Sequence, residues 1–202
     1  MRTHLLAAIL LLTPVAVFAH RLDEYLQATI LSIDKDQLHA EMTLTPGVAV
    51  FPKLAPEIAD RGAYAERVLR DLRLTIDGHS LTPQLVSTKF PSVEAMKEGL
   101  GGIRIEFKAD MPAGSGSHKL IFENHHESAI GAYLVNCLVP GYSDLHITAQ
   151  TRNDSQSHYE LNYTQTGGPS DLLWLGSAAL ILGVRFAVRK RIAKPTAAAA
   201  RS

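Results

Sequence analysis

The chain has 202 residues, of which 46% are hydrophobic and 20% are charged, and its 20 basic and 20 acidic side chains give a formal net charge of zero. The charges are unevenly placed: residues 20–170 hold 13 Lys and Arg against 19 Asp and Glu, about −6, whereas six basic residues and no acidic ones follow from Arg185 onward. The acidic part lacks the basic patch of nucleic-acid-binding proteins, so we expect no nucleic-acid partner. Cys137 is the single cysteine, which excludes an internal disulfide and, among apolar neighbours, predicts a buried thiol.

Residues 1–19 have the three-part pattern of a secretory signal peptide. Arg2 precedes the apolar run at residues 5–12, and Val17 and Ala19 are the small residues ahead of a cleavage site. The alternative is an uncleaved N-terminal anchor, for which the apolar run is short. We therefore expect export, cleavage after Ala19 and a mature chain that begins at His20.

Most segments after His20 alternate apolar and polar residues with period two, which is typical of strands with one buried and one solvated face. The turn signals Asp34-Lys35-Asp36 and Asp77-Gly78 separate such segments. Residues 132–138 are apolar on both faces, which predicts a central strand. The predicted strands are Tyr25–Ile33, Gln37–Leu44, Leu72–Ile76, Ile103–Ala109, Lys119–Glu123, Ala132–Leu138, Leu145–Gln150 and Tyr159–Tyr163.

Two segments indicate helices. From Pro56 to Leu72, apolar residues fall on one helical face, with acidic residues early and basic residues late. Residues 92–98 predict a short helical turn with Ser92 as its N-cap. About eight strands and one or two helices predict that residues 20–166 form an antiparallel β-sandwich with a helical insertion.

Residues 167–171 predict a linker, and residues 172–188 a transmembrane helix. Trp174 suits the headgroup layer near one end of this run, and Arg185 can extend toward the interface at the other. The basic tail at 189–202 predicts a cytoplasmic end by the positive-inside rule. We expect a single-pass inner-membrane protein whose main domain lies in the periplasm. An alternative is a C-terminal sorting signal that is cut before the protein reaches the surface.

Two histidines are candidate metal ligands. After cleavage, the α-amine and imidazole of His20 can chelate one ion together, and imidazole suits copper, nickel and zinc. His125, in the run Glu123-Asn124-His125-His126-Glu127, is a candidate for a further ligand. Because adjacent strand residues point to opposite faces, His125 and His126 do not share an ion unless the strand ends there. The alternative interpretation is an exposed His20 and a polar strand end with one structural histidine.

Motifs for catalysis are missing. Gly114-Ser115-Gly116 does not match a nucleophile elbow, and the sequence has neither a phosphate-binding loop nor a dinucleotide fingerprint. We expect the protein not to be an enzyme. A divalent transition metal is the one cofactor that the residues suggest.

Three segments resemble a family of uncharacterised exported bacterial proteins: Ala19–Thr29, Ala132–Pro140 and Gln150–Gln156. That family is similar to the extracytoplasmic N-terminal domain of nickel/cobalt transporters and of HupE/UreJ-type membrane proteins. This chain departs from transporters because one predicted span cannot form a permease. It also retains only Asp60-Arg61-Gly62 of the acidic loop that some relatives carry, so no calcium site is expected.

The sequence therefore predicts a membrane-anchored periplasmic binding or interaction protein without catalytic activity. Its expected partners are the membrane, through the C-terminal helix, and another membrane protein. The alternative is an accessory protein for nickel, cobalt or copper handling that uses His20.

Overall fold

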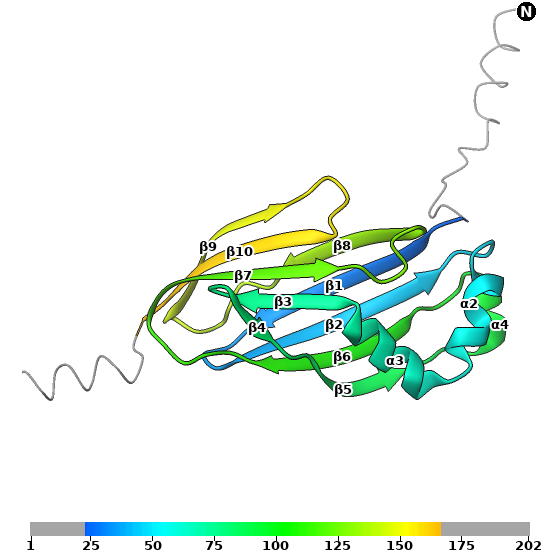
Figure 1. Cartoon of the computed structure of the whole chain (residues 1–202), viewed down its shortest axis with the longest axis horizontal. Helices are drawn as coiled ribbons and strands as arrows, with labels where there is room; N and C mark the ends of the chain where they lie inside the picture. The colour runs from blue at the N-terminus through cyan, green and yellow to red at the C-terminus, as the bar shows by residue number, and fades with distance from the viewer. Residues whose placement is uncertain (1–22, 167–202) are drawn as a thin grey trace, which may run out of the picture.

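Two five-stranded β-sheets dominate the computed structural model, which describes residues 23–166 (Figure 1). Sheet A has the strand order β5-β6-β2-β1-β8, and sheet B has the order β4-β3-β7-β10-β9. The strands are β1 (Tyr25–Ile33), β2 (Gln37–Pro46), β3 (Leu72–Ile76), β4 (His79–Leu81), β5 (Gln84–Lys89), β6 (Ile103–Asp110), β7 (Gly116–Asn124), β8 (Gly131–Cys137), β9 (Leu145–Arg152) and β10 (His158–Gln165). The prediction of a mainly β fold with few helices is confirmed.

Alternating burial places one face of each central strand in a common core. In β1 every second residue from Tyr25 to Ile33 is buried, and β2 pairs with β1 so that its own alternate residues face the same side. The inward residues of both sheets and of the helices form one buried cluster. Burying apolar side chains in this way is the main force that holds the sheets together.

The helices lie between β2 and β3 and between β5 and β6. They are α2 (Phe51–Ile58), α3 (Arg61–Arg70) and α4 (Val93–Lys97). The single helix predicted from Pro56 to Leu72 is wrong in its bounds, because the chain breaks at Asp60, whose side chain accepts a hydrogen bond from Ala63 N and starts α3. Ser92 caps α4 as predicted.

Strand β8 differs most from its prediction. The sequence predicts a central strand at residues 132–138, but β8 lies at the edge of sheet A and, among the described strands, pairs only with β1. That pair is parallel, so sheet A is not wholly antiparallel. The prediction of a central position is wrong because it assumes that other elements cover the outer apolar residues of this strand, whereas Leu134 is 45% exposed.

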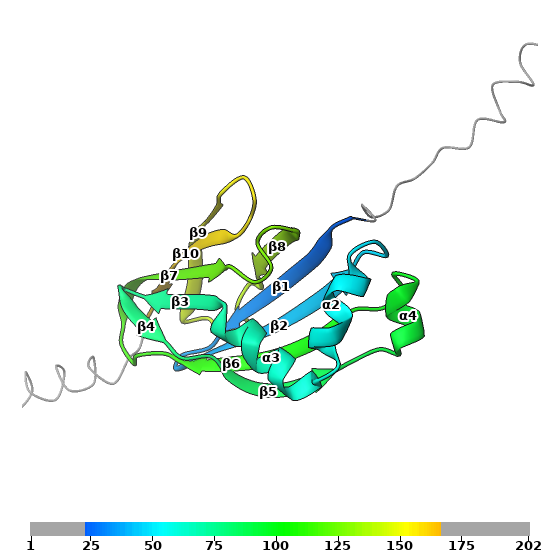
Figure 2. The same ribbon diagram turned by 45° about the vertical axis from the view of Figure 1, so that its right-hand side comes forward.

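The described chain enters and leaves at opposite ends of the sheets (Figures 1 and 2). Asp23 leads into β1 near the end that carries α2 and α4, and β10 ends at the other end (Figure 1). The predicted signal peptide, His20, the linker, the 172–188 span and the basic tail all lie outside the described residues. Within residues 23–166, no helix is both long and apolar enough to cross a bilayer.

Candidate functional site

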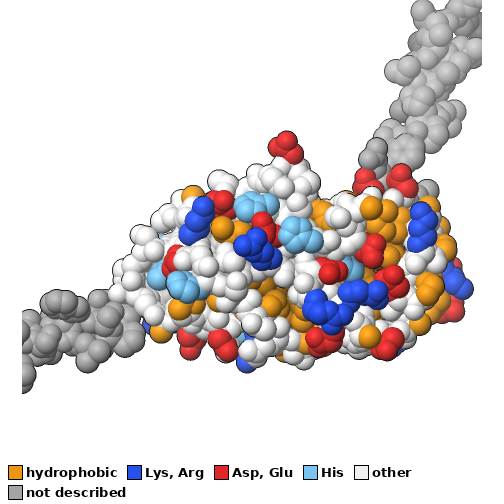
Figure 3. Space-filling model, in the orientation of Figure 1, with side chains coloured by type: hydrophobic (Ala, Val, Ile, Leu, Met, Phe, Trp, Pro, Cys, Tyr) orange, Lys and Arg blue, Asp and Glu red, His pale blue; other side chains and the backbone are white. Residues whose placement is uncertain are grey.

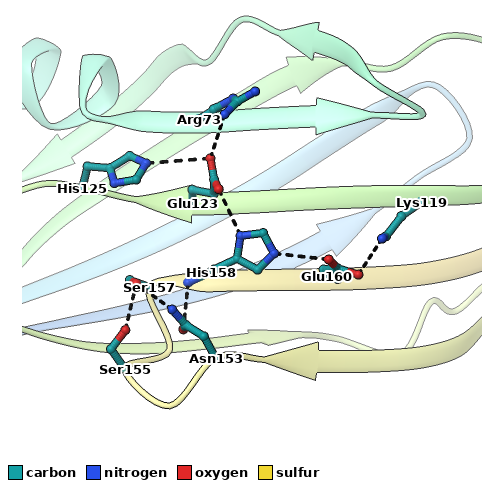
Figure 4. Close-up of polar contacts among 9 residues, drawn as sticks. All are labelled: Arg73, Lys119, Glu123, His125, Asn153, Ser155, Ser157, His158 and Glu160. Atoms are coloured by element: carbon teal, nitrogen blue, oxygen red, sulfur yellow. Dashed lines mark hydrogen bonds and ion pairs between the residues drawn. The ribbon is translucent and has the colours of Figure 1, made fainter.

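The predicted ligand His125 follows the last residue of β7 and lies on the outer face of sheet B (Figure 4). Its side chain is 65% exposed, and its Nε2 lies 3.8 Å from Glu123 Oε2. The strand does end at this point, which allows His125 and His126 to take unrelated positions. His125 therefore remains accessible from solvent, with one weak carboxylate partner.

Glu123 is the centre of a charged cluster on the same face (Figure 4). The strand register places it directly opposite Arg73 of β3 and His158 of β10. Its carboxylate lies 3.0 Å from His158 Nδ1 and 3.4 Å from an Arg73 nitrogen. On the other side of the imidazole, His158 Nε2 lies 3.3 Å from Glu160, which also pairs with Lys119 at 2.7 Å. One imidazole is thus held between two carboxylates.

These contacts change the acidity of the groups involved. Hydrogen bonding to Glu123 raises the pKa of His158, and Glu160 adds to the effect. Burial alone would raise the pKa of Glu123, but the hydrogen bond to His158 and the charge of Arg73 outweigh it and hold the pKa below its usual value. The hydrogen bond from Lys119 lowers the pKa of Glu160. The cluster therefore favours the charged forms of all three groups.

Charges of both signs are interspersed with histidines on the face shown in Figure 3. Among residues 23–166, no three His, Cys, Asp or Glu side chains are arranged to hold a metal ion. In the cluster around Glu123 the potential ligands already pair with one another or with basic side chains. Of the two histidines in this cluster, His125 has the more exposed side chain and can reach a ligand from outside it.

The neighbouring His126 has the opposite environment, because it is only 1% exposed. Its Nδ1 lies 2.7 Å from Asp71 Oδ2, and its Nε2 lies 3.2 Å from the Tyr64 hydroxyl, which in turn contacts the Tyr25 hydroxyl. A consistent assignment has His126 donating from Nδ1 to Asp71 and accepting at Nε2 from Tyr64, which accepts from Tyr25. A hydrogen-bonded chain therefore runs from a half-exposed carboxylate into the core.

The backbone of His126 is equally well held. Its N–H donates to Asn124 Oδ1, and its carbonyl accepts from the Gln27 amide at 2.8 Å and from the Tyr133 hydroxyl at 2.9 Å. These partners belong to both sheets. His126 is thus the structural histidine that the sequence pattern allowed, and its network ties the 125–130 segment across the two layers.

Burial raises the pKa of the Tyr25 and Tyr64 hydroxyls well above the usual value. At neutral pH these phenols stay protonated and act as hydrogen-bond donors, not as nucleophiles or bases. Burial also raises the pKa of the Cys137 thiol, to about 11. The prediction of a buried Cys137 is confirmed, since its residue is 7% exposed.

The outer face of sheet A carries an apolar surface that the sequence did not identify as such. Ile30 of β1 and Val86 of β5 are 40% and 55% exposed, and Leu138 follows β8 with 54% of its surface exposed. They line an open groove of about 340 Å³, together with polar side chains from β1, β2 and β6. Its lining residues are Ile30, Ser32, His39, Ala40, Glu41, Val86, Glu106, Phe107 and Leu138.

Polar groups flank the apolar part of this groove. Glu41 and Glu106 lie directly opposite each other on β2 and β6. Both carboxylates have a partner: Arg104 lies 2.9 Å from Glu41, and the Ser87 hydroxyl donates to Glu106 at 2.9 Å. Two acidic groups beside an apolar surface would favour a partner that offers apolar side chains and a basic group.

Next to the groove, the outer residues of β1 and β8 form an apolar stripe. The register places Leu26 beside Ala132 and Ala28 beside Leu134, so the stripe crosses both strands. Exposed apolar surface that continues over neighbouring elements is typical of interaction sites. Its signal in the sequence is the apolar outer positions Ala132, Leu134 and Leu138, a pattern that a buried strand shares.

A side chain from β9 covers part of the free side of β8. Arg152 of β9 donates from Nε to the Val135 carbonyl at 2.8 Å and also contacts the Asn136 amide oxygen. Its guanidinium lies over the Tyr159 ring, 5.1 Å from the centroid. Arg152 therefore bridges the edges of the two sheets and blocks part of the β8 edge.

Searches of protein-family models, curated proteins and solved structures found no match to the chain.

Proposed function

We propose that the protein is a membrane-anchored, periplasm-facing β-sandwich that binds another membrane protein and carries out no chemistry itself. The observation that carries the proposal is the exposed apolar surface of sheet A, with Leu134 45% exposed on an edge strand. The signal-peptide pattern of residues 1–19 and the apolar run at 172–188 support the localisation.

A membrane protein is the favoured partner because the anchor restricts the domain to the bilayer surface. Confinement to one membrane raises the effective concentration of a partner in that membrane, so a modest apolar surface is sufficient for binding. Glu41 and Glu106 add a preference for a segment that bears a basic side chain.

Site-specific photo-crosslinking in the native membrane tests this proposal. A photoreactive residue at position 134, on the outer face of sheet A, is expected to give a discrete crosslinked species. The matched control is position 119 on sheet B, where the Lys119 side chain is 48% exposed. Equal labelling at both positions, or none at 134, would contradict the assignment of sheet A as the interface.

A second candidate function is the handling of nickel, cobalt or copper through His20 and His125. It is favoured by the exposure of the His125 imidazole and by the position of the start of β1, which lies near the segment that follows His125. The Tyr25 N–H donates to the Ile130 carbonyl at 2.8 Å, so the start of β1 lies against the segment that follows His125. His20 is five residues from Tyr25, a separation that spans at most about 17 Å.

Metal binding to the mature protein tests the second candidate. Purified mature chain should bind one divalent ion, and both His20→Ala and a residue added ahead of His20 should weaken binding. Unchanged binding in both variants would reject the N-terminal chelate. Mass spectrometry of the native protein tests cleavage after Ala19 and also the alternative of a sorted protein with a cleaved tail.

A further inference from the structure

The segment between β8 and β9 lies at the end of the sheets where the described chain stops (Figure 1). Thr166 N, in the last described residue, donates to the Asp144 carbonyl at 2.9 Å. The Gln165 amide donates to the Lys35 carbonyl at 3.4 Å, so the β1–β2 turn belongs to the same end. The last described residue, Thr166, therefore lies beside this segment.

The segment is unusually apolar for a surface loop. Leu138, Val139 and Tyr142 are 54%, 84% and 51% exposed, and Pro140 lies between them. Loops over a soluble surface are generally polar, because their backbone and side chains face water. Three large apolar side chains on one loop thus suggest a partner that is itself apolar.

Ion pairs and hydrogen bonds hold this loop in place. The Tyr142 hydroxyl donates to Asp34 Oδ2 at 3.4 Å, and Lys35 pairs with Asp144 at 2.5 Å. The Leu138 N–H donates to the Leu31 carbonyl at 2.8 Å, which continues the β1–β8 pairing into the loop. The loop therefore presents its apolar side chains from a fixed support.

If residues 172–188 span the bilayer, which rests on the proposed function, the linker brings this end of the domain close to the bilayer. Residues 167–171 can extend by at most about 17 Å. A domain joined by so short a connection has this end facing the membrane, while the end with α2 and α4 lies farther away. The exposed apolar loop is at the end that the linker reaches.

We propose that Leu138–Tyr142 is a membrane-contacting loop that inserts into the interfacial layer of the bilayer that holds the anchor. Val139 and Leu138 supply the apolar side chains, and Tyr142 has the apolar ring and polar hydroxyl that favour the headgroup region. The neighbouring Asp34, Lys35, Asp36 and Asp144 sum to about −2, so attraction to anionic lipid is not the driving force. Insertion should therefore occur in zwitterionic lipid and persist at high salt.

Tryptophan quenching by brominated lipid tests the loop and the anchor separately, because Trp174 is the single tryptophan of the chain. The full chain is reconstituted into phosphatidylcholine vesicles with or without bromine on the acyl chains. Wild-type protein reports on the anchor through Trp174. Val139→Trp in a Trp174→Phe background reports on the loop, and Tyr142→Trp in that background is a second reporter. Val48→Trp in the same background is the control, since Val48 is 41% exposed and follows β2 at the opposite end.

The expected result is loss of emission and a shift to shorter wavelength at positions 139 and 142, with no change at position 48. Quenching of Trp174 without quenching at 139 and 142 would overturn the loop proposal and leave the anchor intact. Equal quenching at 139 and 48 would also overturn it, because the added indole itself would then account for insertion. Quenching at 139 with Trp174 unaffected would support the loop and reject the anchor. No quenching at any position would reject both.

Discussion

Replacing His126 with alanine should destabilise the protein strongly, whereas the same change at His125 should have almost no effect. The two residues are adjacent, but His126 is 1% exposed and His125 has a side chain that is 65% exposed. His126→Ala removes the imidazole that joins Asp71 to Tyr64 and leaves the backbone hydrogen bonds of residue 126 in place.

The size of the effect follows from the buried ring and the hydrogen-bond acceptor that the substitution removes. Removing a buried aromatic side chain costs about 3–5 kcal/mol, and the smaller imidazole belongs near the lower limit. The Tyr64 hydroxyl is also left without its acceptor inside the core, at a cost of about 1 kcal/mol. We expect a total of about 4 kcal/mol, and about 0.5 kcal/mol or less for His125→Ala. At about 3 °C per kcal/mol for a domain of this size, the melting temperature should fall by roughly 12 °C.

Thermal unfolding of the full chain in mild detergent, followed by near-ultraviolet circular dichroism of the tyrosines, measures both variants. Tyr25→Phe measures the contribution of a hydrogen bond without that of a cavity, because it removes one buried hydroxyl and little volume. It should lower the free energy of unfolding by about 1 kcal/mol. Similar melting temperatures for His126→Ala and His125→Ala would refute the structural role of the buried His126 imidazole.

Three further predictions concern single groups. Glu123→Gln should lower the pKa of His158, which the hydrogen bond to Glu123 raises in the native protein. NMR titration of the imidazole in both proteins checks this, and an unchanged pKa would exclude Glu123 as the main cause. Because folding raises the pKa of His158, the stability that the Glu123–His158 pair contributes is fully present below about pH 6.5 and is lost as the pH rises through the pKa of the folded protein. The free energy of unfolding, measured in urea at pH 6 and at pH 8, should therefore change more in the wild type than in Glu123→Gln. Gly131→Ala should lower the free energy of unfolding by about 1–3 kcal/mol, because the added Cβ would lie 2.5 Å from the Tyr133 hydroxyl and push that hydroxyl from the His126 carbonyl. A melting temperature equal to that of the wild type would contradict this and show that the Tyr133 ring moves aside without cost. Cys137, with a pKa of about 11, should react slowly with iodoacetamide at pH 8 and quickly in denaturant, and equal rates would contradict its burial.

Local patterns predicted much of the secondary structure. The bounds of β1 and β3 and the Asp77-Gly78 turn agree with the prediction, because alternation and turn chemistry are properties of neighbouring residues. The edge strand β5 was missed, since nearly all its residues are exposed and it shows no alternation. The helix break at Asp60 was missed because Glu57 and Asp60 fit the acidic first turn of a single helix, whereas the Asp60 side chain in fact caps α3.

Features that depend on distant partners could not be predicted in the same way. The sequence indicated one structural histidine near residue 125, but choosing His126 requires Asp71 and Tyr64, which are 55 and 62 positions away. The position of β8 likewise depends on its pairing with β1. An apolar outer face is consistent with either a covered strand or an exposed interface, and only the arrangement of the sheets distinguishes them.

The parallel pairing of β1 with β8 has a consequence for the order in which the protein assembles. Tyr25 lies opposite Gly131, so about a hundred residues separate the partners in the chain. If the chain crosses the membrane from its N-terminus, as proposed, β1 and β2 can pair early, but the other edge of β1 stays open until β8 has crossed. Closing such distant contacts is slow, which leaves time for translocation before the sheet is complete. Sheet A would then acquire its last strand, and with it the β8 part of the apolar stripe, only after most of the described chain has crossed.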